Sequence, residues 1–298
     1  MIVSCFSFDL TVTIQNTNST LNNTEHHSLS CRTGSKKNIQ YCMKLVTFTI
    51  NSTPTAKSRI GALLGNQVVD FTAILPCHDM LEFLHGGDTL LSQAKTIIQS
   101  GHHRHDLKAV TLKAPISNPE KILCVGMNYK EHCTEQNVPI PTEPLIFSKF
   151  ASTITHPGAP IRFDSALTKK MDWEVEMCVV IGKEVPRNTL EADAMPYIVG
   201  YTVAHDVSAR DWQMEKNGGQ WLLGKSMDTF SPIGPAITTK DEMGDKIKNT
   251  GVRCLVNGNV VQSSNTNELV FDAPKLVAWI SKFITMKPGD LIFTGTPS

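Results

Sequence analysis

Three carboxylates beside two apolar segments are the residues of this sequence best suited to chemistry. Glu174 and Glu176 lie two positions apart at the start of the apolar run 175–181, and Asp206 follows the apolar run 197–204. Residues two apart in a strand share a face, so both glutamates should point to one side. Like charges beside an apolar strand repel each other and lose hydration, and a bound cation would relieve both costs. The alternative without a functional role is a polar strand end with two solvated acids.

The composition of this acidic set favours a hard metal ion. It offers three oxygen donors and no cysteine ligand. Carboxylates of this kind suit Mg²⁺ or Mn²⁺, with Ca²⁺ as a further possibility. If the hypothesis is right, the three carboxylates must converge in space.

A second candidate pair combines an imidazole with a carboxylate. His132 and Glu135 form the pattern H-x-x-E. Residues three apart on a helix are neighbours. A carboxylate beside an imidazole orients the ring and raises its basicity, which a proton-transfer group requires. The same pattern is also typical of an ordinary surface pair.

Arg210 and Gln213 form a third candidate pair. If a helix begins at Ser208, their side chains share one face. The guanidinium fork and the amide could then bind a carboxylate of a substrate. Simple surface exposure is the alternative for each residue.

The segment 219–226 satisfies the P-loop pattern G-x-x-x-x-G-K-[ST], but we reject a nucleotide site there. A P-loop needs a buried strand before it and a helix after it, so that backbone amides can hold the phosphates. The segment before it, 211–217, is polar, and the segment after it contains Pro232 and Pro235. Lys225 therefore needs another role.

The elements that must position these residues are mostly strands. Strand patterns occur at 121–125, 145–149, 174–181, 198–203 and 252–261. Asn257-Gly258 between two β-rich runs predicts a type I′ hairpin. One clear helix follows, with Asp272 as its cap and Pro274 in its first turn, and its apolar positions are Leu276, Ile280, Phe283 and Ile284.

The chain divides into three parts. Residues 1–42 contain a polar low-complexity stretch at 15–24, and we expect a disordered leader or a gene-model extension there. Residues 43–115 predict a small N-terminal α+β domain that begins with a strand at Met43, carries two short strands at 60–70 and helices at 80–84 and 90–98. Residues 116–298, which contain all the candidate residues named above, form the third and largest part.

The composition excludes several classes of protein. Lys and Arg total 28, Asp and Glu total 28, and the formal net charge is zero, so the chain lacks the basic excess of nucleic-acid binders. No apolar run approaches the ~18 residues of a membrane-spanning helix. The eight cysteines contain no C-x-x-C pair, which favours free thiols over a disulfide framework.

Four segments together resemble the fumarylacetoacetate hydrolase superfamily. They are Asp172-Trp173-Glu174-Val175-Glu176, the run 200–211 (GYTVAHDVSARD), the run 224–230 (GKSMDTF) and Thr294-Gly295-Thr296-Pro297. The resemblance covers about 120–298. It implies an α+β fold built as a mixed β-sandwich roll like the C-terminal domain of fumarylacetoacetase, a divalent metal in a pocket and usually a homodimer.

The resemblance also assigns roles to residues that match the family's motifs. The implied metal ligands are Glu174, Glu176 and Asp206. The implied catalytic residues are His132, Glu135 and Lys225, and the implied substrate-pocket residues are Arg210, Gln213 and Thr296. The implied substrates are small 2-oxo acids, which react through an enolate.

Several activities of this family remain open at this point. The resemblance favours an Mg²⁺-dependent oxaloacetate keto–enol tautomerase, with acylpyruvate or fumarylacetoacetate-type C–C hydrolysis second and oxaloacetate decarboxylation third. An inactive homologue is the alternative of another class, because related chains continue beyond Thr-Gly-Thr-Pro while this one ends at Ser298, which suggests a truncated domain. The resemblance implies a mitochondrial location, with the cytoplasm as the alternative, and no nucleic-acid or membrane partner.

Overall fold

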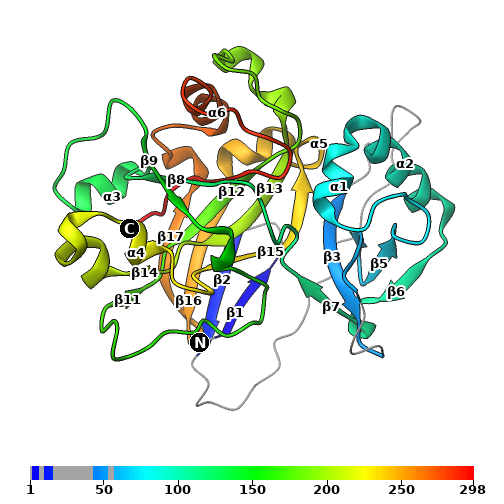
Figure 1. Cartoon of the computed structure of the whole chain (residues 1–298), viewed down its shortest axis with the longest axis horizontal. Coiled ribbons are helices and arrows are strands. Elements are labelled where there is room, and N and C mark those ends of the chain that lie inside the picture. Colours follow the sequence, from blue (N-terminus) through cyan, green and yellow to red (C-terminus); the bar gives the residue numbers. More distant parts are fainter. Residues whose placement is uncertain (1, 7–9, 16–42, 53–56) are drawn as a thin grey trace.

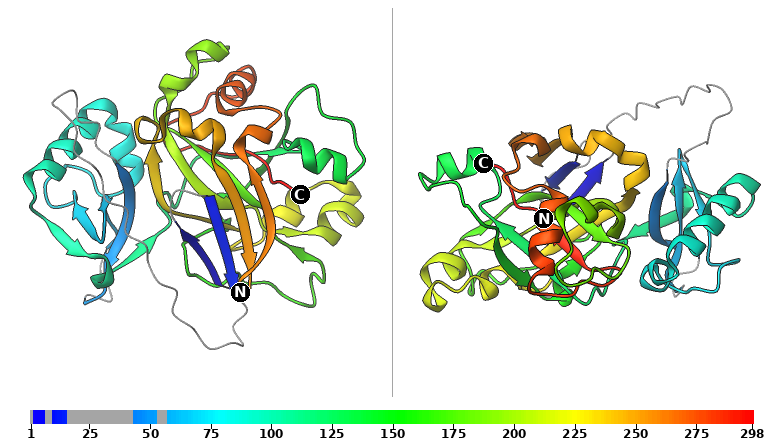
Figure 2. Two further views of the ribbon diagram at one scale, coloured as in Figure 1. Left: turned by 180° about the vertical axis from the view of Figure 1, so that it is seen from behind. Right: turned by 90° about the horizontal axis from the view of Figure 1, so that it is seen from above.

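The computed structural model describes the chain except for residues 1, 7–9, 16–42 and 53–56. Most described strands join one 12-stranded sheet, whose main path is β6-β5-β4-β3-β15-β13-β12-β18-β8-β9, while β10 pairs with β15 and β7 with β3. A smaller lobe with α1 and α2 lies beside a larger lobe (Figures 1 and 2). The chain therefore has the mixed α/β character predicted from its sequence.

The smaller lobe contains the elements predicted for it. Its strands are β3 (Lys44–Ile50), β4 (Arg59–Leu64), β5 (Gln67–Asp70), β6 (Arg104–Asp106) and β7 (Val110–Lys113). Its helices are α1 (Met80–His85) and α2 (Gly87–Ser100). The strand after Met43, the two short strands around residue 65 and both helices are thus confirmed.

The larger lobe carries the remaining elements from residue 116 onward. Its strands are β8 (Ile122–Gly126), β9 (Leu145–Lys149), β10 (Ile154–Thr155), β11 (Met171–Asp172), β12 (Val175–Ile181), β13 (Ile198–His205), β14 (Ser208–Ala209), β15 (Ser231–Thr239), β16 (Gly251–Val256), β17 (Asn259–Asn265) and β18 (Leu291–Phe293). Its α-helices are α3 (Lys130–Glu135), α4 (Leu222–Lys225), α5 (Lys240–Met243) and α6 (Ala273–Ser281).

Within the described ranges, eight short helical segments connect these elements. They are η1 (Leu107–Ala109), η2 (Ala151–Thr153), η3 (Glu191–Asp193), η4 (Met195–Tyr197), η5 (Asp211–Glu215, a π-helix), η6 (Asn217–Gly219), η7 (Gly244–Asn249) and η8 (Thr266–Glu268). Before α4 the chain forms η6 and no strand, which agrees with the rejection of a P-loop.

Local patterns explain the hairpin and the helix predicted in the larger lobe. Asn257 and Gly258 both have positive φ, 52° and 83°, as a type I′ turn requires. Asp272 caps α6 by accepting a hydrogen bond from the backbone N–H of Lys275. Phe283, which we expected on the buried face, lies beyond the end of this helix and is 63% exposed.

Strand β12 is the structural centre of the larger lobe. It lies between β13 and β18 and is buried along its whole length, as its apolar sequence predicts. Val175 pairs with His205 across the antiparallel β12–β13 ladder. The backbone N–H of Asp206 also donates to the carbonyl of Glu174 at 2.8 Å. This register brings the start of β12 beside the end of β13.

The two lobes are continuous through one sheet and one apolar core. Leu45 and Lys44 of β3 pair with Ile237 and Thr238 of β15. A single cluster of buried apolar side chains combines residues of the small lobe, such as Phe83, with residues of β12, β15 and β18. None of the helices in the described part of the chain is long and apolar enough to cross a membrane.

The first residues of the chain differ from the expectation of a disordered leader. Strands β1 (Ile2–Phe6) and β2 (Leu10–Gln15) pair with each other, and β2 runs parallel to β16. The alternating pattern Leu10-Thr11-Val12-Thr13-Ile14 is a strand signal that the polar residues after it obscure. Residues 16–42, which include nearly all of the low-complexity stretch, lie outside the described residues.

Candidate metal centre and substrate pocket

The three predicted ligand carboxylates converge, as the metal hypothesis requires. One oxygen from each of Glu174, Glu176 and Asp206 lies within 4.8 Å of those of the other two. All three side chains are buried, because they leave the ends of strands in the middle of the large sheet. A divalent ion bound through oxygen at about 2.1 Å from each ligand would fit between oxygens at this separation.

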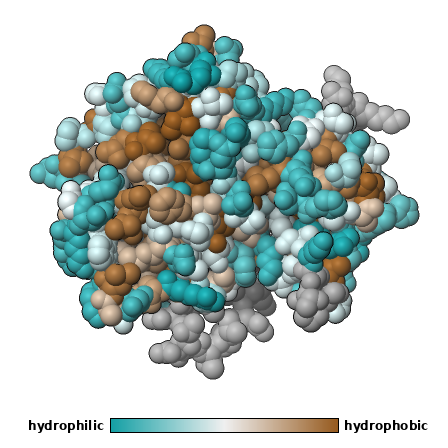
Figure 3. Space-filling view, viewed as in Figure 1, coloured by the Kyte–Doolittle hydropathy of each residue, from teal (hydrophilic) through white to brown (hydrophobic). Residues whose placement is uncertain are grey.

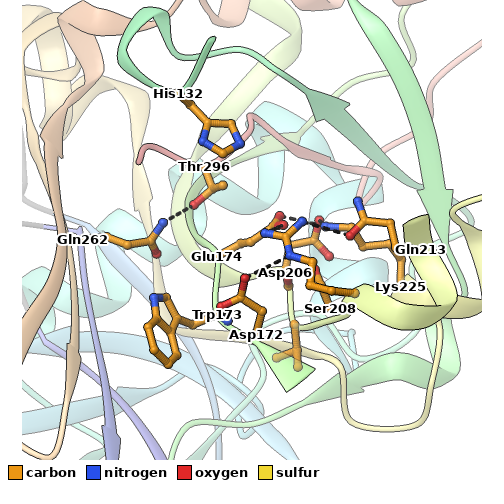
Figure 4. A network of polar contacts seen from close by, with 12 residues as sticks. His132, Asp172, Trp173, Glu174, Asp206, Ser208, Gln213, Lys225, Gln262 and Thr296 are labelled. Atoms are coloured by element: carbon orange, nitrogen blue, oxygen red, sulfur yellow. Dashed lines mark hydrogen bonds and ion pairs between the residues drawn. The ribbon is translucent and has the colours of Figure 1, made fainter. Parts of the chain in front are cut away.

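Two cationic side chains, which the family resemblance assigned to catalysis and substrate binding, contact this carboxylate triad. The Lys225 ammonium donates to Glu174 Oε2 at 2.7 Å and to Asp206 Oδ2 at 2.9 Å. The Arg210 guanidinium lies 2.7 Å from Glu174 Oε1. Figure 4 shows Lys225 pointing toward Glu174 and Asp206. Lys225, for which the family resemblance implied a catalytic role, is thus part of this cluster.

Lys149 is a third cation at the triad, and it is not among the residues predicted from the sequence. It closes β9 and donates to Asp206 Oδ1, to the carbonyl of Val207 at 3.2 Å and to the carbonyl of Phe230 at 2.8 Å. Its side chain is fully buried. In the sequence, Lys149 appears only as a lysine at the end of an apolar strand. Lysines are common at solvated strand ends, so this position did not indicate a site residue.

Glu176 lacks such a cation. Its Oε2 accepts a hydrogen bond from the backbone N–H of Gly295 at 2.6 Å, and no lysine or arginine in the described part of the chain forms an ion pair with it. Burial raises the pKa of Glu176 well above its ordinary value, and the charges of Asp206 and Glu174 raise it further. A metal ion would supply the missing positive charge, so the residues fit the predicted ion.

Gly295 is the position where this contact demands a glycine. Its φ of 93° lies in the left-handed region, and a Cβ there would stand 2.8 Å from the carbonyl oxygen of Val125. The N–H of residue 295, in the turn that follows β18, can therefore reach Glu176 only if this residue is a glycine.

Two lysines favour the charged form of Asp206. Burial alone would raise the pKa of Asp206, but the ammonium groups of Lys149 and Lys225 outweigh it and lower that pKa. Burial likewise opposes the charge of Lys225, yet Asp206 and Glu174 raise its pKa overall. The pKa values of Asp206 and Glu176 therefore shift in opposite directions, because only Asp206 forms ion pairs with lysines.

Arg210 and Gln213 share a face, although the helix that carries Gln213 begins later than expected. Ser208 belongs to strand β14, and η5 begins at Asp211. Backbone pairing of β14 with β11 holds the chain extended there. Arg210 still donates to Gln213 Oε1 at 2.9 Å and to Asp172 Oδ2 at 2.9 Å.

Thr296 is held beside β12 by a second amide that the sequence did not single out. Its hydroxyl donates to the carbonyl of Val175 at 3.0 Å and accepts from Gln262 Nε2 at 2.8 Å. The Gln262 Oε1 in turn accepts from the Val175 N–H at 2.9 Å. Figure 4 shows Thr296 between Gln262 and His132.

The predicted dyad lies on α3, and Figure 4 shows His132 above Thr296 and apart from Glu174 and Asp206. His132 Nδ1 is 3.2 Å from Glu135 Oε2, so the carboxylate orients the ring as predicted. His132 is largely shielded while Glu135 is about half exposed. This contact leaves Nε2 as the ring nitrogen that does not face Glu135.

Two buried polar atoms near the triad have no hydrogen-bond partner among the described residues. They are the hydroxyl of Tyr129 and Nε2 of His205. Burial raises the pKa of Tyr129, and the negative charge of Glu176 adds to that effect. The Tyr129 hydroxyl is therefore within electrostatic reach of the triad.

Replacing His205 should flatten the acid dependence of stability. Burial lowers the pKa of His205 to about 4, whereas the unfolded chain titrates near 6.5. Because the unfolded chain binds the proton first, stability falls as the pH drops through this window, by at most about 3 kcal/mol. Urea unfolding at pH 7 and pH 4.5 should show a smaller loss for His205→Asn than for the exposed control His102→Asn. An equal loss in both variants would contradict this expectation.

Comparison with known sequences gives a consistent family. The family described as fumarylacetoacetate (FAA) hydrolase C-terminal matches residues 121–298. A Xenopus laevis protein named oxaloacetate tautomerase fahd2, mitochondrial, is 52% identical over 258 residues, covering 86% of this chain and 80% of the relative. The Dictyostelium discoideum fumarylacetoacetate hydrolase domain-containing protein 2 homolog is 43% identical, covering 86% of both chains.

Solved structures agree with this result. A putative HpcE protein from Mycobacterium smegmatis superimposes with a TM-score of 0.73 at 33% identity, covering 85% of this chain and 86% of that one. Maleylpyruvate hydrolase from Sphingobium, solved with manganese(II) and pyruvate, gives a TM-score of 0.71 at 27% identity, covering 86% and 89%. These matches confirm the predicted fold class.

Proposed function

Because this chain belongs to the fumarylacetoacetate hydrolase family, we propose that it is a metal-dependent oxaloacetate keto–enol tautomerase. The observation that carries the metal dependence is the buried carboxylate triad whose member Glu176 has no cationic partner among the described residues. The choice of oxaloacetate rests on relatives of 43–52% identity, several of which are named oxaloacetate tautomerase.

Glu174, Glu176 and Asp206 would hold the ion. Oxygen-only donors favour Mg²⁺ or Mn²⁺, with Ca²⁺ as the third choice, and a structural neighbour contains manganese(II). When bound, a divalent ion polarises a substrate carbonyl and stabilises enolate charge.

The charges around the triad suit an anionic substrate. Lys149, Lys225 and Arg210 with a divalent ion would oppose four carboxylates, which are Asp172 and the triad, and leave one net positive charge. Arg210 would bind a substrate carboxylate through its fork, with the Gln213 amide as a further donor. Thr296 would line the same pocket, with its hydroxyl proton held by the Val175 carbonyl. Lys225 would face the charge that develops on the substrate oxygen.

The dyad would move the proton. Tautomerisation takes a proton from a carbon beside the carbonyl and delivers one to the enol oxygen, or the reverse. His132 Nε2 would accept and return this proton, while Glu135 stabilises the imidazolium. Since α3 carries both residues and they do not touch the triad, we expect α3 to settle over the bound substrate.

Hydrolysis of C–C bonds is the second candidate, because maleylpyruvate hydrolase has the same fold. There His132 would activate water instead of moving a proton on the substrate. Decarboxylation of oxaloacetate is a third candidate that uses the same binding groups.

Enol-oxaloacetate should lose its ultraviolet absorbance faster with the purified chain and Mg²⁺ than with chelator. Variant His132→Gln should slow this reaction by about a hundredfold or more, while the matched control His156→Gln should not. A rate no higher than that of Glu174→Ala would exclude the tautomerase. Release of pyruvate from acylpyruvates, or of CO₂ from oxaloacetate, would favour the hydrolase or the decarboxylase. Metal binding without any of these activities would indicate an inactive homologue.

We also propose that the chain forms a homodimer. Apolar side chains gather on the left and upper left of the face in Figure 3, over the part that carries α3, α4 and α6. Large exposed apolar residues include Val138, Ile140, Leu145, Phe150, Leu223 and Phe283. Light scattering should give twice the 32.8 kDa of one chain, and Phe150→Asp should lower this mass. A wild-type monomer would contradict the proposal.

The location proposed is the mitochondrion. Relatives from Xenopus laevis, Rattus norvegicus and Bos taurus carry the word mitochondrial in their names. Fractionation of cells that express the natural chain tests this location, and recovery in the cytosol alone would overturn it.

A further inference from the structure

A cavity of about 290 Å³ lies where the two lobes meet, far from the triad. It is bounded by α2, by the segment after β12, by the start of β13 and by α5, and we name it the α2 cavity. Figure 1 shows α5 beside the lobe that carries α1 and α2. Gly182 and Ile198 line it at one end of β12 and β13, whereas Glu174 and Asp206 stand at the other. Seven residues of strand separate these ends by roughly 20 Å.

Three lysines from three segments meet at this cavity. They are Lys95 of α2, Lys183 after β12 and Lys240 of α5. The carboxylate of Asp88 has a lowered pKa, first through its hydrogen bond from Lys183 and then through the charges of all three lysines. Asp241 is the other acid of the lining, so the cavity wall carries one more positive charge than negative charges.

Lys240 has bonding capacity to spare. Its ammonium donates to the carbonyls of Met195 and Pro196 at 3.0 and 3.1 Å. An ammonium offers three donors, and no third partner occurs among the described residues. Burial lowers the pKa of Lys240, and nearby Lys183 lowers it too, although Asp241 opposes them. An anion beside this ammonium would therefore gain both a hydrogen bond and a charge partner.

The rest of the lining is apolar. Met43, Leu84, Leu91, Ile198 and Val199 form a hydrocarbon surface contributed by both lobes. Cavities of this size are at the lower end for small-molecule sites, which suits a chain of about six to eight carbons. A fully polar anion would leave this surface without contacts.

We propose that the α2 cavity binds a small aliphatic carboxylate. The carboxylate group would accept hydrogen bonds from Lys240 and lie close to Lys183, and the hydrocarbon chain would pack on Leu91 and its neighbours. Such a ligand would contact both lobes at once and so stabilise their packing. This site is independent of the proposed catalytic activity.

Calorimetric titration of the full chain with octanoate, without added metal, tests the proposal. We expect saturable binding of one octanoate per chain, and no binding of octylamine, which has the same hydrocarbon chain and the opposite charge. Variant Leu91→Trp should abolish binding by filling the cavity. Lys240→Gln should weaken it about tenfold, while Lys282→Gln, at an exposed lysine after α6, should bind normally.

The catalytic pocket also suits carboxylates, so binding must be separated from it. Octanoate should bind Glu176→Gln as tightly as the wild type. Equal binding of octylamine, unchanged binding by Leu91→Trp, or no saturation up to about 10 mM would overturn the proposal. If Lys240→Gln fails to fold by circular dichroism, Lys95→Gln replaces it and should weaken binding in the same direction.

Discussion

Glu176→Gln should abolish the stabilisation by Mg²⁺ or Mn²⁺ and lower kcat/KM by at least about a hundredfold. The amide keeps the size of the side chain and can still accept from the Gly295 N–H. It cannot supply the negative charge that a cation needs. Because burial already disfavours the charged carboxylate, the metal-free variant should melt no lower than the metal-free wild type.

An unchanged metal-free melting temperature together with a lost response to metal would separate loss of the metal from loss of the fold. Melting temperatures with Mg²⁺ or Mn²⁺ and with chelator, together with tautomerase rates, measure both effects. Glu191→Gln is the matched control, because Glu191 is an exposed glutamate of η3, in the connection between the far ends of β12 and β13. A metal-induced rise in melting temperature equal to that of the wild type would exclude Glu176 as a ligand.

Lys149→Met should destabilise the fold by about 3–5 kcal/mol. The Lys149 ammonium is buried and bonded to Asp206 and to two backbone carbonyls. Its removal leaves the Asp206 charge with only Lys225 and the Val207 carbonyl without this donor, while the Phe230 carbonyl keeps the Val207 N–H. Methionine has a similar length, so lost packing contributes little to the effect.

Urea unfolding of metal-free protein measures this loss, with the exposed Lys108→Met as the control. The double variant Lys149→Met/Asp206→Asn should recover part of the stability, because it also removes the Asp206 charge that the single variant leaves less well paired. It should stay inactive, since a predicted ligand is gone. A single-variant loss below about 1 kcal/mol, or no recovery in the double variant, would mean that the ion pair is not the cause.

Local patterns were enough to predict most elements that position the site. The apolar run 175–181 is buried as β12, the dipeptide Asn257-Gly258 makes the predicted turn, and Asp272 caps α6. Each of these results depends on residues close together in the chain. The alternation in 10–14 was equally local, and it was missed because the polar residues after it dominated the composition.

The spacing of the acids likewise determined that Glu174 and Glu176 share a side of one strand. Asp206 was added because it directly follows an apolar run, and its convergence with the two glutamates depends on the β12–β13 register. Lys149 and Gln262 were not predictable in this way. Lys149 is 57 positions from Asp206, and Gln262 is 34 positions from Thr296, so no local spacing relates them.

The sequence by itself therefore determined the types of the groups and the strands that carry them. The tertiary structure alone decided which cation faces which carboxylate. Lys149 and Lys225 neutralise Asp206 and Glu174, whereas Glu176 receives only a backbone N–H. The physical reason is that charge balance in a buried site depends on distances of a few ångströms between segments far apart in the chain, and these distances are set by sheet register and packing.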